Sequence, residues 1–405
     1  MNLLEKTLRI LEQPACDNCL GRQFGQLLSG FTNNERGKLL RTIAAMSIDN
    51  EDYKGAADMS NFHDYAFHNL EIKAKTARKQ CSVCGDIFAR LEKHAEKIAK
   101  NRQYEYKTFL IGTRLSSGLI EKEEALWERV GIDYCEPLKA EINREIGKLA
   151  EAATKTRFSR KNPDVNMIVN FGSGKIEITP NPIFIYGEYQ KLKRGIPQTK
   201  WPSKKYRTSV EEIIAKPFML ATRGRGHKLH GMGREDIDAR CLAWRPFVLE
   251  ITGPKRRETA MKKLAGKIGK EVKVRNLRPS NIEEVRRIKE ARTDKTYRAV
   301  VKCNKPISKD DLEEIKSIVG EISQRTPQRV LHRRADLRRK RHVKQIKYKY
   351  MDKRTFMIEV RGEAGLYIKE LISGDSGRTR PSISELLKNE CTCKELDVMK
   401  IHVKG

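Results

Sequence analysis

Apolar residues recur with two different periods along the first half of the chain. Helical spacing of leucine, isoleucine and alanine is found in residues 1–12 and 140–153. Alternation with the period of two that strands require is found in four stretches: 108–113, 165–171, 176–178 and 182–187. The order of these segments predicts an α+β domain, which ends near the polar, proline-containing stretch 198–203.

The second half of the chain again mixes β runs with helical patterns. We expect strands at 246–251, 296–302 and 355–360. We expect helices at 256–268, 281–292, 309–319 and 382–388. The fold class is therefore α+β throughout, with the larger sheet in the C-terminal half, and the domains are expected at 1–205 and 206–405.

Composition adds a functional class to this outline. A chain of 405 residues is too long for one ordinary core, so two or three domains are expected. Lys and Arg total 83 against 53 Asp and Glu, a formal net charge of +30. A charged thermophilic surface would balance the two signs, whereas this excess favours a polyanionic partner such as a nucleic acid.

The sequence also bears on location. No apolar run approaches the length needed to span a bilayer, and the N-terminal segment lacks the pattern of a secretory signal. Nine cysteines, an odd number, suit a reducing compartment better than a disulfide framework. We therefore expect a cytoplasmic protein without a membrane partner.

Four of the cysteines form two Cys-x-x-Cys pairs, Cys16 with Cys19 and Cys81 with Cys84. Two such turns can place four thiolates around one tetrahedral zinc ion, although the segment between the pairs is long. A redox pair, a disulfide or unrelated buried cysteines are the alternatives. No general base lies nearby in the sequence, so we expect a structural and not a catalytic ion.

The run Gly-Arg-Glu-Asp at residues 233–236 places an aspartate among cations in a glycine-rich loop. A carboxylate beside a cation stays ionised at neutral pH and can act as a nucleophile or a base. On charge alone, a helix cap formed by Asp236 or Asp238, or a surface pair with Arg234, explains the run better than chemistry does. A resemblance to a known family reverses this preference.

Four segments resemble the archaeal-type pseudouridine synthases that modify the T-loop arm of tRNA, and they occur in that family's order. They are residues 186–201, 233–238, 296–299 and 365–375. The resemblance covers essentially the whole chain. It implies that tRNA is the substrate and that uridines at tRNA positions 54 and 55 are isomerised. It implies no organic cofactor and no obligatory protein partner.

The resemblance also assigns roles to individual residues. Asp236 becomes the catalytic nucleophile, and Tyr297 the aromatic residue that stacks on the target base. Lys369 and Arg234 are expected to hold the charge of the aspartate, and Tyr367 to contact the substrate. Without the resemblance, a tyrosine on an alternating β run would be assigned to the core.

The same resemblance divides the chain further. It implies a zinc module at about 16–84 and a THUMP-like RNA-binding fold at about 65–190. A catalytic domain with a central mixed or antiparallel sheet is expected to follow at 206–405.

Two basic segments are expected to contact RNA phosphates. Residues 325–354 contain 13 Lys or Arg against two acids, and the loop 222–228 lies just before the aspartate. A solvated charged helix would usually interleave more acids. The residues that we expect to bind RNA are Arg223, Arg225, Lys228, Arg333, Arg334, Arg338 and Arg339.

Two other functions fit parts of the sequence. A non-catalytic zinc-containing RNA-binding protein explains the charge and the cysteines but not the Gly-Arg-Glu-Asp run. A THUMP-containing methyltransferase or thiolation enzyme would need a glycine-rich cofactor loop after a buried strand, and no convincing one is found.

Overall fold

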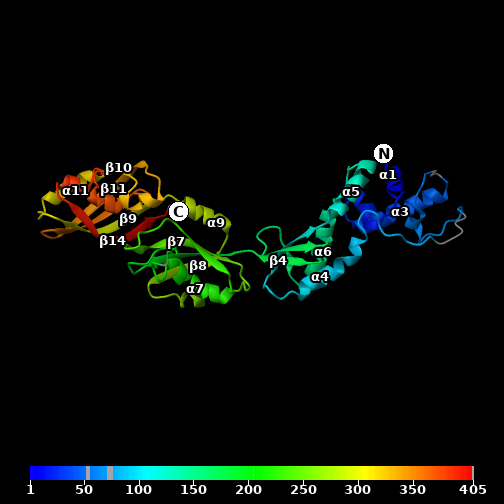
Figure 1. The fold of residues 1–405 in the computed structure, drawn as a ribbon, viewed down its shortest axis with the longest axis horizontal. Helices are drawn as coiled ribbons and strands as arrows, with labels where there is room; N and C mark the ends of the chain where they lie inside the picture. Colours follow the sequence, from blue (N-terminus) through cyan, green and yellow to red (C-terminus); the bar gives the residue numbers. More distant parts are fainter. Residues whose placement is uncertain (52–54, 71–75, 204, 404–405) are drawn as a thin grey trace. The chain divides into compact units, whose positions relative to one another are not determined.

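The computed structural model describes residues 1–51, 55–70, 76–203 and 205–403, apart from the side chain of Arg333. Contacts divide the chain into two units, Met1–Asn181 and Pro182–Gly405 (Figure 1). This division lies upstream of the boundary expected at 205. The reason is strand β5 (Ile183–Lys191), which hydrogen-bonds to two strands of the second unit.

The first unit is built on a four-stranded sheet with the order β2-β1-β3-β4. Its strands are β1 (Thr108–Arg114), β2 (Arg157–Phe158), β3 (Val165–Asn170) and β4 (Ile176–Pro180). Strand β1 is parallel to β2 and β3, and β4 is antiparallel to β3. Side chains of β1 and β3 alternate in burial, as their sequence predicts.

Helices supply the rest of the first core. They are α1 (Leu3–Ile10), α2 (Asp17–Gly21), α3 (Asn33–Asp49), α4 (Leu91–Lys100), α5 (Ser117–Val130) and α6 (Leu138–Thr154), with 3-10 turns η1 (Arg22–Phe24), η2 (Met59–Phe62) and η3 (Ile87–Arg90). Helices α2 and α3 pack closely because Gly37 has no side chain. A Cβ atom there would lie 1.9 Å from the carbonyl oxygen of Asp17.

The second unit contains a ten-stranded sheet with the order β13-β10-β11-β12-β9-β14-β7-β5-β8, with β6 also paired to β7. Its further strands are β6 (Gly226–Gly231), β7 (Arg240–Thr252), β8 (Val272–Ser280), β9 (Asp294–Cys303), β10 (Gly320–Arg325), β11 (Arg338–Asp352), β12 (Thr355–Gly362), β13 (Thr379–Arg380) and β14 (Cys391–His402). The pair β7–β14 is parallel, and its other pairs are antiparallel. The expected mixed sheet is confirmed.

Short helices connect these strands. They are α7 (Val210–Thr222), α8 (Met261–Ala265), α9 (Ile282–Glu290), η4 (Asp311–Ile318), η5 (Gln328–Arg333), α10 (Ile368–Ser373) and α11 (Ile383–Leu386). The helix expected at 256–268 is reduced to α8, which ends before Gly266, a poor helix former. The helix expected at 309–319 is a 3-10 helix. Strands β9 and β7 carry apolar side chains into separate core clusters of this unit.

Candidate functional site

The loop at residues 232–239 joins β6 to β7 and carries the Gly-Arg-Glu-Asp run. Gly233 has a φ of +73°, a conformation that other residues adopt only with strain. A Cβ atom at this position would make only ordinary contacts, at 3.4 Å from Nη1 of Arg245 and 3.5 Å from Nζ of Lys295. The glycine is therefore required by the turn.

Glu235 anchors this loop to the interior. Its side chain is fully buried, with Nε of Arg245 at 3.2 Å and Nζ of Lys191 at 3.8 Å. The hydroxyl of Tyr189 donates a hydrogen bond of 3.1 Å to the same carboxylate. Because a buried charge is stable only when it is paired and hydrogen-bonded, these three groups hold Glu235 in place and turn the next side chain outward.

Lys191 also holds the main chain of the loop. Its ammonium donates hydrogen bonds of 2.9 Å, 3.0 Å and 3.2 Å to the carbonyl oxygens of Ile196, Asp236 and Ile237. Burial lowers the pKa of Lys191, and the negative charge of Glu235 partly opposes this effect. The main chain of the candidate nucleophile and of the residue after it is thus held by Lys191.

Two cations contact the Asp236 carboxylate. Nη1 of Arg329 donates a hydrogen bond of 3.1 Å to Oδ1, and Nζ of Lys369 lies 3.6 Å from Oδ2. Arg329 is held in turn by Glu370, whose Oε1 accepts a bond of 2.7 Å from its Nε. Arg234, expected as a partner of Asp236, is exposed and forms no ion pair within the described residues.

Lys369 bridges two carboxylates. It lies 2.6 Å from Oδ2 of Asp238, closer than it lies to Asp236. Burial raises the pKa of Asp238, but the hydrogen bond and charge of Lys369 outweigh it, and the net pKa is lowered. One ammonium therefore links the loop at residues 232–239 to the start of α10.

Tyr297 lies in β9 between two core clusters and is half-buried. Burial raises the pKa of its phenol to about 12, and the charges of Asp236 and Glu235 act in the same direction, whereas Arg245 opposes them. The ring is therefore neutral at physiological pH. Asp236 is thus one of the charged groups that act on this phenol.

Lys295 is a further buried cation beside this site. It lies two residues before Tyr297 and donates a hydrogen bond of 3.2 Å to the carbonyl oxygen of Thr293. Burial and the positive charge of Arg245 lower its pKa to about 8. The site therefore contains an amine that loses its proton close to neutral pH.

Tyr367 occupies the residue before α10. Its hydroxyl accepts a hydrogen bond of 2.7 Å from Nη1 of Arg334, and its main-chain groups are both bound by the Gln324 amide. This brings one expected RNA-binding arginine next to an expected substrate-contacting residue.

The other residues expected to bind RNA lie at the surface of the second unit. Arg223, Arg225 and Lys228 are exposed around the start of β6, and Arg338 is exposed at the start of β11. Arg339 is half-buried and donates to the Thr326 hydroxyl. The side chain of Arg333 lies outside what the structure describes.

The four paired cysteines of the first unit meet at one point. Their Sγ atoms all lie within 4.8 Å of one another, and those of Cys16 and Cys84 are 3.6 Å apart. Tetrahedral bonds of about 2.3 Å to zinc would place the sulfurs about 3.8 Å apart. Thiol donors from Cys16, Cys19 and Cys84 lower the pKa of Cys81. The cluster could therefore hold a metal ion.

A buried arginine next to this cluster fits an anionic centre. The Arg22 side chain is fully buried, and its Nε and Nη2 have no hydrogen-bond partner in the described part of the chain. Burial disfavours its charge, but the nearby Cys19 and Glu123 outweigh this and raise its pKa. A zinc ion with four thiolates carries a net negative charge that this guanidinium would balance.

Five residues in or beside the candidate site were not singled out by the sequence pattern: Lys191, Glu235, Arg245, Lys295 and Arg329. Arg329 lies inside a basic segment that was expected only to follow phosphates. The signal for Glu235 was its position in the Gly-Arg-Glu-Asp run, where alternation turns it inward when Asp236 points outward.

Comparison with known proteins identifies relatives over nearly the full length. The family description "Pus10, C-terminal" matches residues 184–402, and "Pus10 THUMP domain, archaeal" matches residues 94–170, a shorter range than the expected 65–190. A tRNA pseudouridine synthase Pus10 of Pyrococcus furiosus is 39% identical, with 98% of each chain covered. One of Methanopyrus kandleri is 37% identical, with 96% of each covered.

Solved structures are more distant. A crystal structure of a Cbf5-Nop10-Gar1 complex aligns with a TM-score of 0.33 and 18% identity, covering 52% of this chain and 47% of the other. Among the described residues, no helix is both long enough and apolar enough to cross a membrane.

Proposed function

The chain belongs to the Pus10 family of tRNA pseudouridine synthases, and we propose on this premise that Asp236 is the catalytic carboxylate with which it isomerises uridine in the T-loop arm of tRNA. The observation that carries the residue assignment is the outward-facing carboxylate of Asp236 between Arg329 and Lys369. The activity is that of an isomerase, for which no redox cofactor is required.

The reaction breaks the glycosidic C–N bond of a uridine and makes a C–C bond to the rotated base. A carboxylate near the anomeric carbon can act in this reaction as a nucleophile or as a base. Arg329 and Lys369 contact this carboxylate, and its main-chain carbonyl is fixed by Lys191. This arrangement supplies a preorganised carboxylate at a position half-open to solvent.

Tyr297 is proposed to contact the displaced uracil. An enzyme that acts on a base must take it out of its stack and hold it against apolar or aromatic side chains. The neutral ring of Tyr297, with its electrostatic coupling to Asp236, suits this role. Tyr367, held by Arg334, is proposed to contact the RNA beside the target nucleotide.

The basic residues of the second unit are proposed to position the tRNA. Phosphate contacts fix register without reading sequence. Arg223, Arg225, Lys228 and Arg338 are exposed and suited to this task, and Arg333 and Arg339 are proposed with them. Zinc is proposed as a structural ion on the four cysteines of the first unit, since their spacing fits it.

The test is a modification assay on an unmodified tRNA transcript, with pseudouridine mapped by carbodiimide labelling and primer extension. We expect new stops in the T-loop arm with the unaltered chain and none with Asp236→Asn, which removes the charge at constant size. RNA affinity should change little. Asp310→Asn, an exposed aspartate at the start of η4, is the matched control.

Two results would contradict the proposal. Full modification by a clean Asp236→Asn preparation would remove the aspartate from the mechanism. Tight tRNA binding with no modified uridine would leave only a non-catalytic RNA-binding protein. A transcript with cytidine in place of the T-loop uridines tests whether these uridines are the modified positions. No stop should then appear in that arm.

A further inference from the structure

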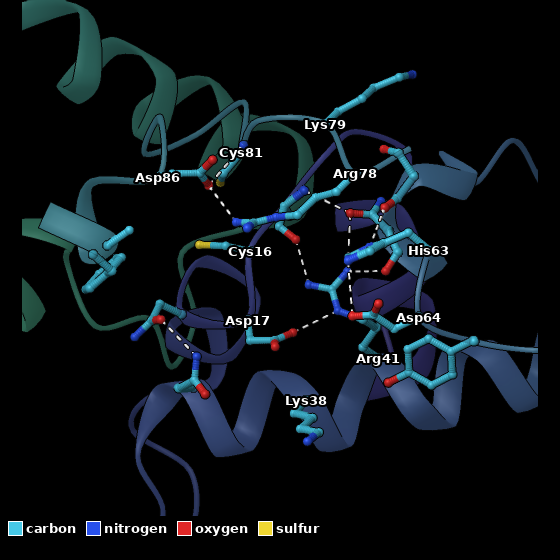
Figure 2. A pocket seen from close by; sticks show the side chains of 18 of the residues that line it. Cys16, Asp17, Lys38, Arg41, His63, Asp64, Arg78, Lys79, Cys81 and Asp86 are labelled. Carbon is cyan, nitrogen blue, oxygen red and sulfur yellow. Dashed lines mark hydrogen bonds and ion pairs between the residues drawn. The ribbon is translucent and has the colours of Figure 1, made fainter. Parts of the chain in front are cut away.

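The first unit contains a cavity of about 690 Å³ that none of the proposed chemistry uses. It lies beside the four-cysteine cluster, between α3, the η2 turn and the segment 78–89 (Figure 2). Its size is in the range of sites for small organic ligands, and it is too small for a nucleic-acid duplex. Cys16 and Cys81 form part of its wall.

The wall of this cavity, which we call the zinc-side pocket, is polar. It carries four cations, Lys38, Arg41, Arg78 and Lys79, and three aspartates. Arg41 has a structural role. It donates a hydrogen bond of 2.8 Å to Asp17, and it donates three more to the Ala15 carbonyl and to two oxygens of Asn61. Arg78 lies 3.2 Å from Asp86 and remains exposed.

Lys38 differs from these cations. It is exposed on α3 and has no acidic partner in the described part of the chain. Figure 2 shows it on the helix side of the pocket, with Arg78 and Asp86 on the opposite side. The pocket therefore has an unpaired ammonium at one edge and an exposed guanidinium at the opposite edge, and each is a donor for an anionic group.

The pocket also offers groups that suit a base. Tyr65 and Phe88 line it, and both are half-buried. The Tyr65 ring is held edge-on against Phe62 at 6.0 Å, and its hydroxyl lies 2.9 Å from the Thr42 hydroxyl. Ser60 also lines the pocket; the residue is 3% exposed, and its side chain interacts with the Asp58 carboxylate.

From this combination we propose that the zinc-side pocket binds one unpaired nucleotide of an RNA strand. The phosphate lies toward Lys38 and Arg78, and the base lies against Tyr65, within reach of the Ser60 hydroxyl. Unpaired bases are typically recognised by stacking on aromatic rings and by bonds to their edges. The inference rests on the proposed function only in taking RNA as the partner, since the pocket lies in the first unit and Asp236 in the second.

Binding is tested with the full chain by fluorescence anisotropy of a labelled four-nucleotide RNA, a labelled RNA duplex and a labelled mononucleotide. We expect the single strand to bind and the blunt duplex to bind without dependence on the pocket. Lys38→Ala should weaken the single strand and lower the slope of log K against log salt by about 0.7, the value for one lost phosphate contact. Tyr65→Ala should weaken it by about tenfold.

Lys122→Ala is the matched control, because Lys122 is exposed on α5 and does not line the pocket. Unchanged affinity and salt slope in Lys38→Ala would overturn the proposal, and this variant alters only an exposed side chain, so folding is preserved. Equal, pocket-dependent binding of the mononucleotide would show a free-nucleotide site and overturn the assignment to a strand.

The two proposals fail in distinguishable ways. If the pocket variants bind normally while Asp236→Asn loses modification, the pocket assignment is wrong and the enzymatic function stands. If strand binding depends on Lys38 and Tyr65 while no chain modifies tRNA, the enzymatic proposal is wrong and the pocket assignment stands.

Discussion

The ammonium of Lys191 donates a hydrogen bond of 3.0 Å to the main-chain carbonyl of Asp236, so the candidate nucleophile is positioned through its backbone by a residue 45 positions earlier. The same ammonium lies 3.8 Å from the buried Glu235 carboxylate. The Lys191 ammonium therefore has two functions: it holds the backbone of the loop, and it neutralises the buried Glu235 carboxylate. This predicts that changes at Lys191 affect catalysis and folding together.

Lys191→Met keeps the length of the side chain but removes its charge and donors. We expect it to lower the free energy of unfolding by about 3 kcal/mol, as is typical when one partner of a buried ion pair is removed. We expect kcat to fall more than KM rises, because the substitution disturbs the loop that carries Asp236 and leaves the RNA contacts in place. Urea unfolding and steady-state kinetics measure the two effects.

Lys193→Ala is the control, since Lys193 is exposed two residues further along the chain. It should leave stability and kcat unchanged. Unaltered kcat in folded Lys191→Met would show that the carbonyl contact with Asp236 does not matter for turnover.

Arg329 predicts a second kinetic effect. Arg329→Ala removes the hydrogen bond of 3.1 Å to Asp236, and it also frees Glu370. Bonds between charged groups are strong, so we expect kcat/KM to fall by about tenfold or more. Arg329→Lys keeps the charge but loses the forked geometry, and should recover part of the activity.

The informative comparison is with the salt dependence of tRNA binding. If Arg329 acts on the aspartate, the slope of log K against log salt stays near that of the unaltered chain in both variants. If it is mainly a phosphate contact, as its basic segment suggested, the slope falls by about 0.9. The second result with normal kcat would remove Arg329 from the catalytic site.

The sequence predicted the positions of individual strands better than it predicted how the strands pair in the sheets. Alternation in residues 165–171 and 296–302 identified β3 and β9, because side-chain period is a local property. It could not assign β5 to the second unit, since the pairing of β5 with β7 joins residues far apart in the chain. Of the two cations that contact Asp236, Lys369 was expected and Arg329 was missed, for the same reason. Arg234 is adjacent in sequence but exposed, whereas Arg329 arrives from η5.

Lys295 predicts an unusual dependence of stability on pH. Its pKa is lowered from 10.5 to about 8 in the folded chain, so between these values the unfolded chain binds more protons. The contribution of Lys295 to stability therefore rises with pH from about 8 to about 10.5 and is lowest below pH 8. Full linkage would correspond to about 3 kcal/mol, which is an upper value because some solvent reaches the group.

The measurement is a double difference in urea unfolding between the unaltered chain and Lys295→Met, at pH 8 and at pH 10.5. Other titrating groups cancel in the difference. We expect the methionine variant to gain relative stability at pH 8 and to lose that gain at pH 10.5. A difference that does not vary with pH would show that the lysine keeps an ordinary pKa in the folded chain.

Metal content gives the last prediction. The chain as purified should contain about one zinc ion, and Cys84→Ser should abolish it, because three thiolates and a hydroxyl make a weaker tetrahedral site. Since binding of structural zinc contributes about 10 kcal/mol or more to folding, loss of the ion should unfold the surrounding helices of the first unit while the second keeps its own core. The control is Cys393→Ser, which alters a half-buried cysteine of β14 and should retain the ion.

Elemental analysis measures the metal content, and limited proteolysis measures the unfolding of the first unit. A metal-free chain with an intact first unit would mean that the four thiols need no ion to hold their geometry.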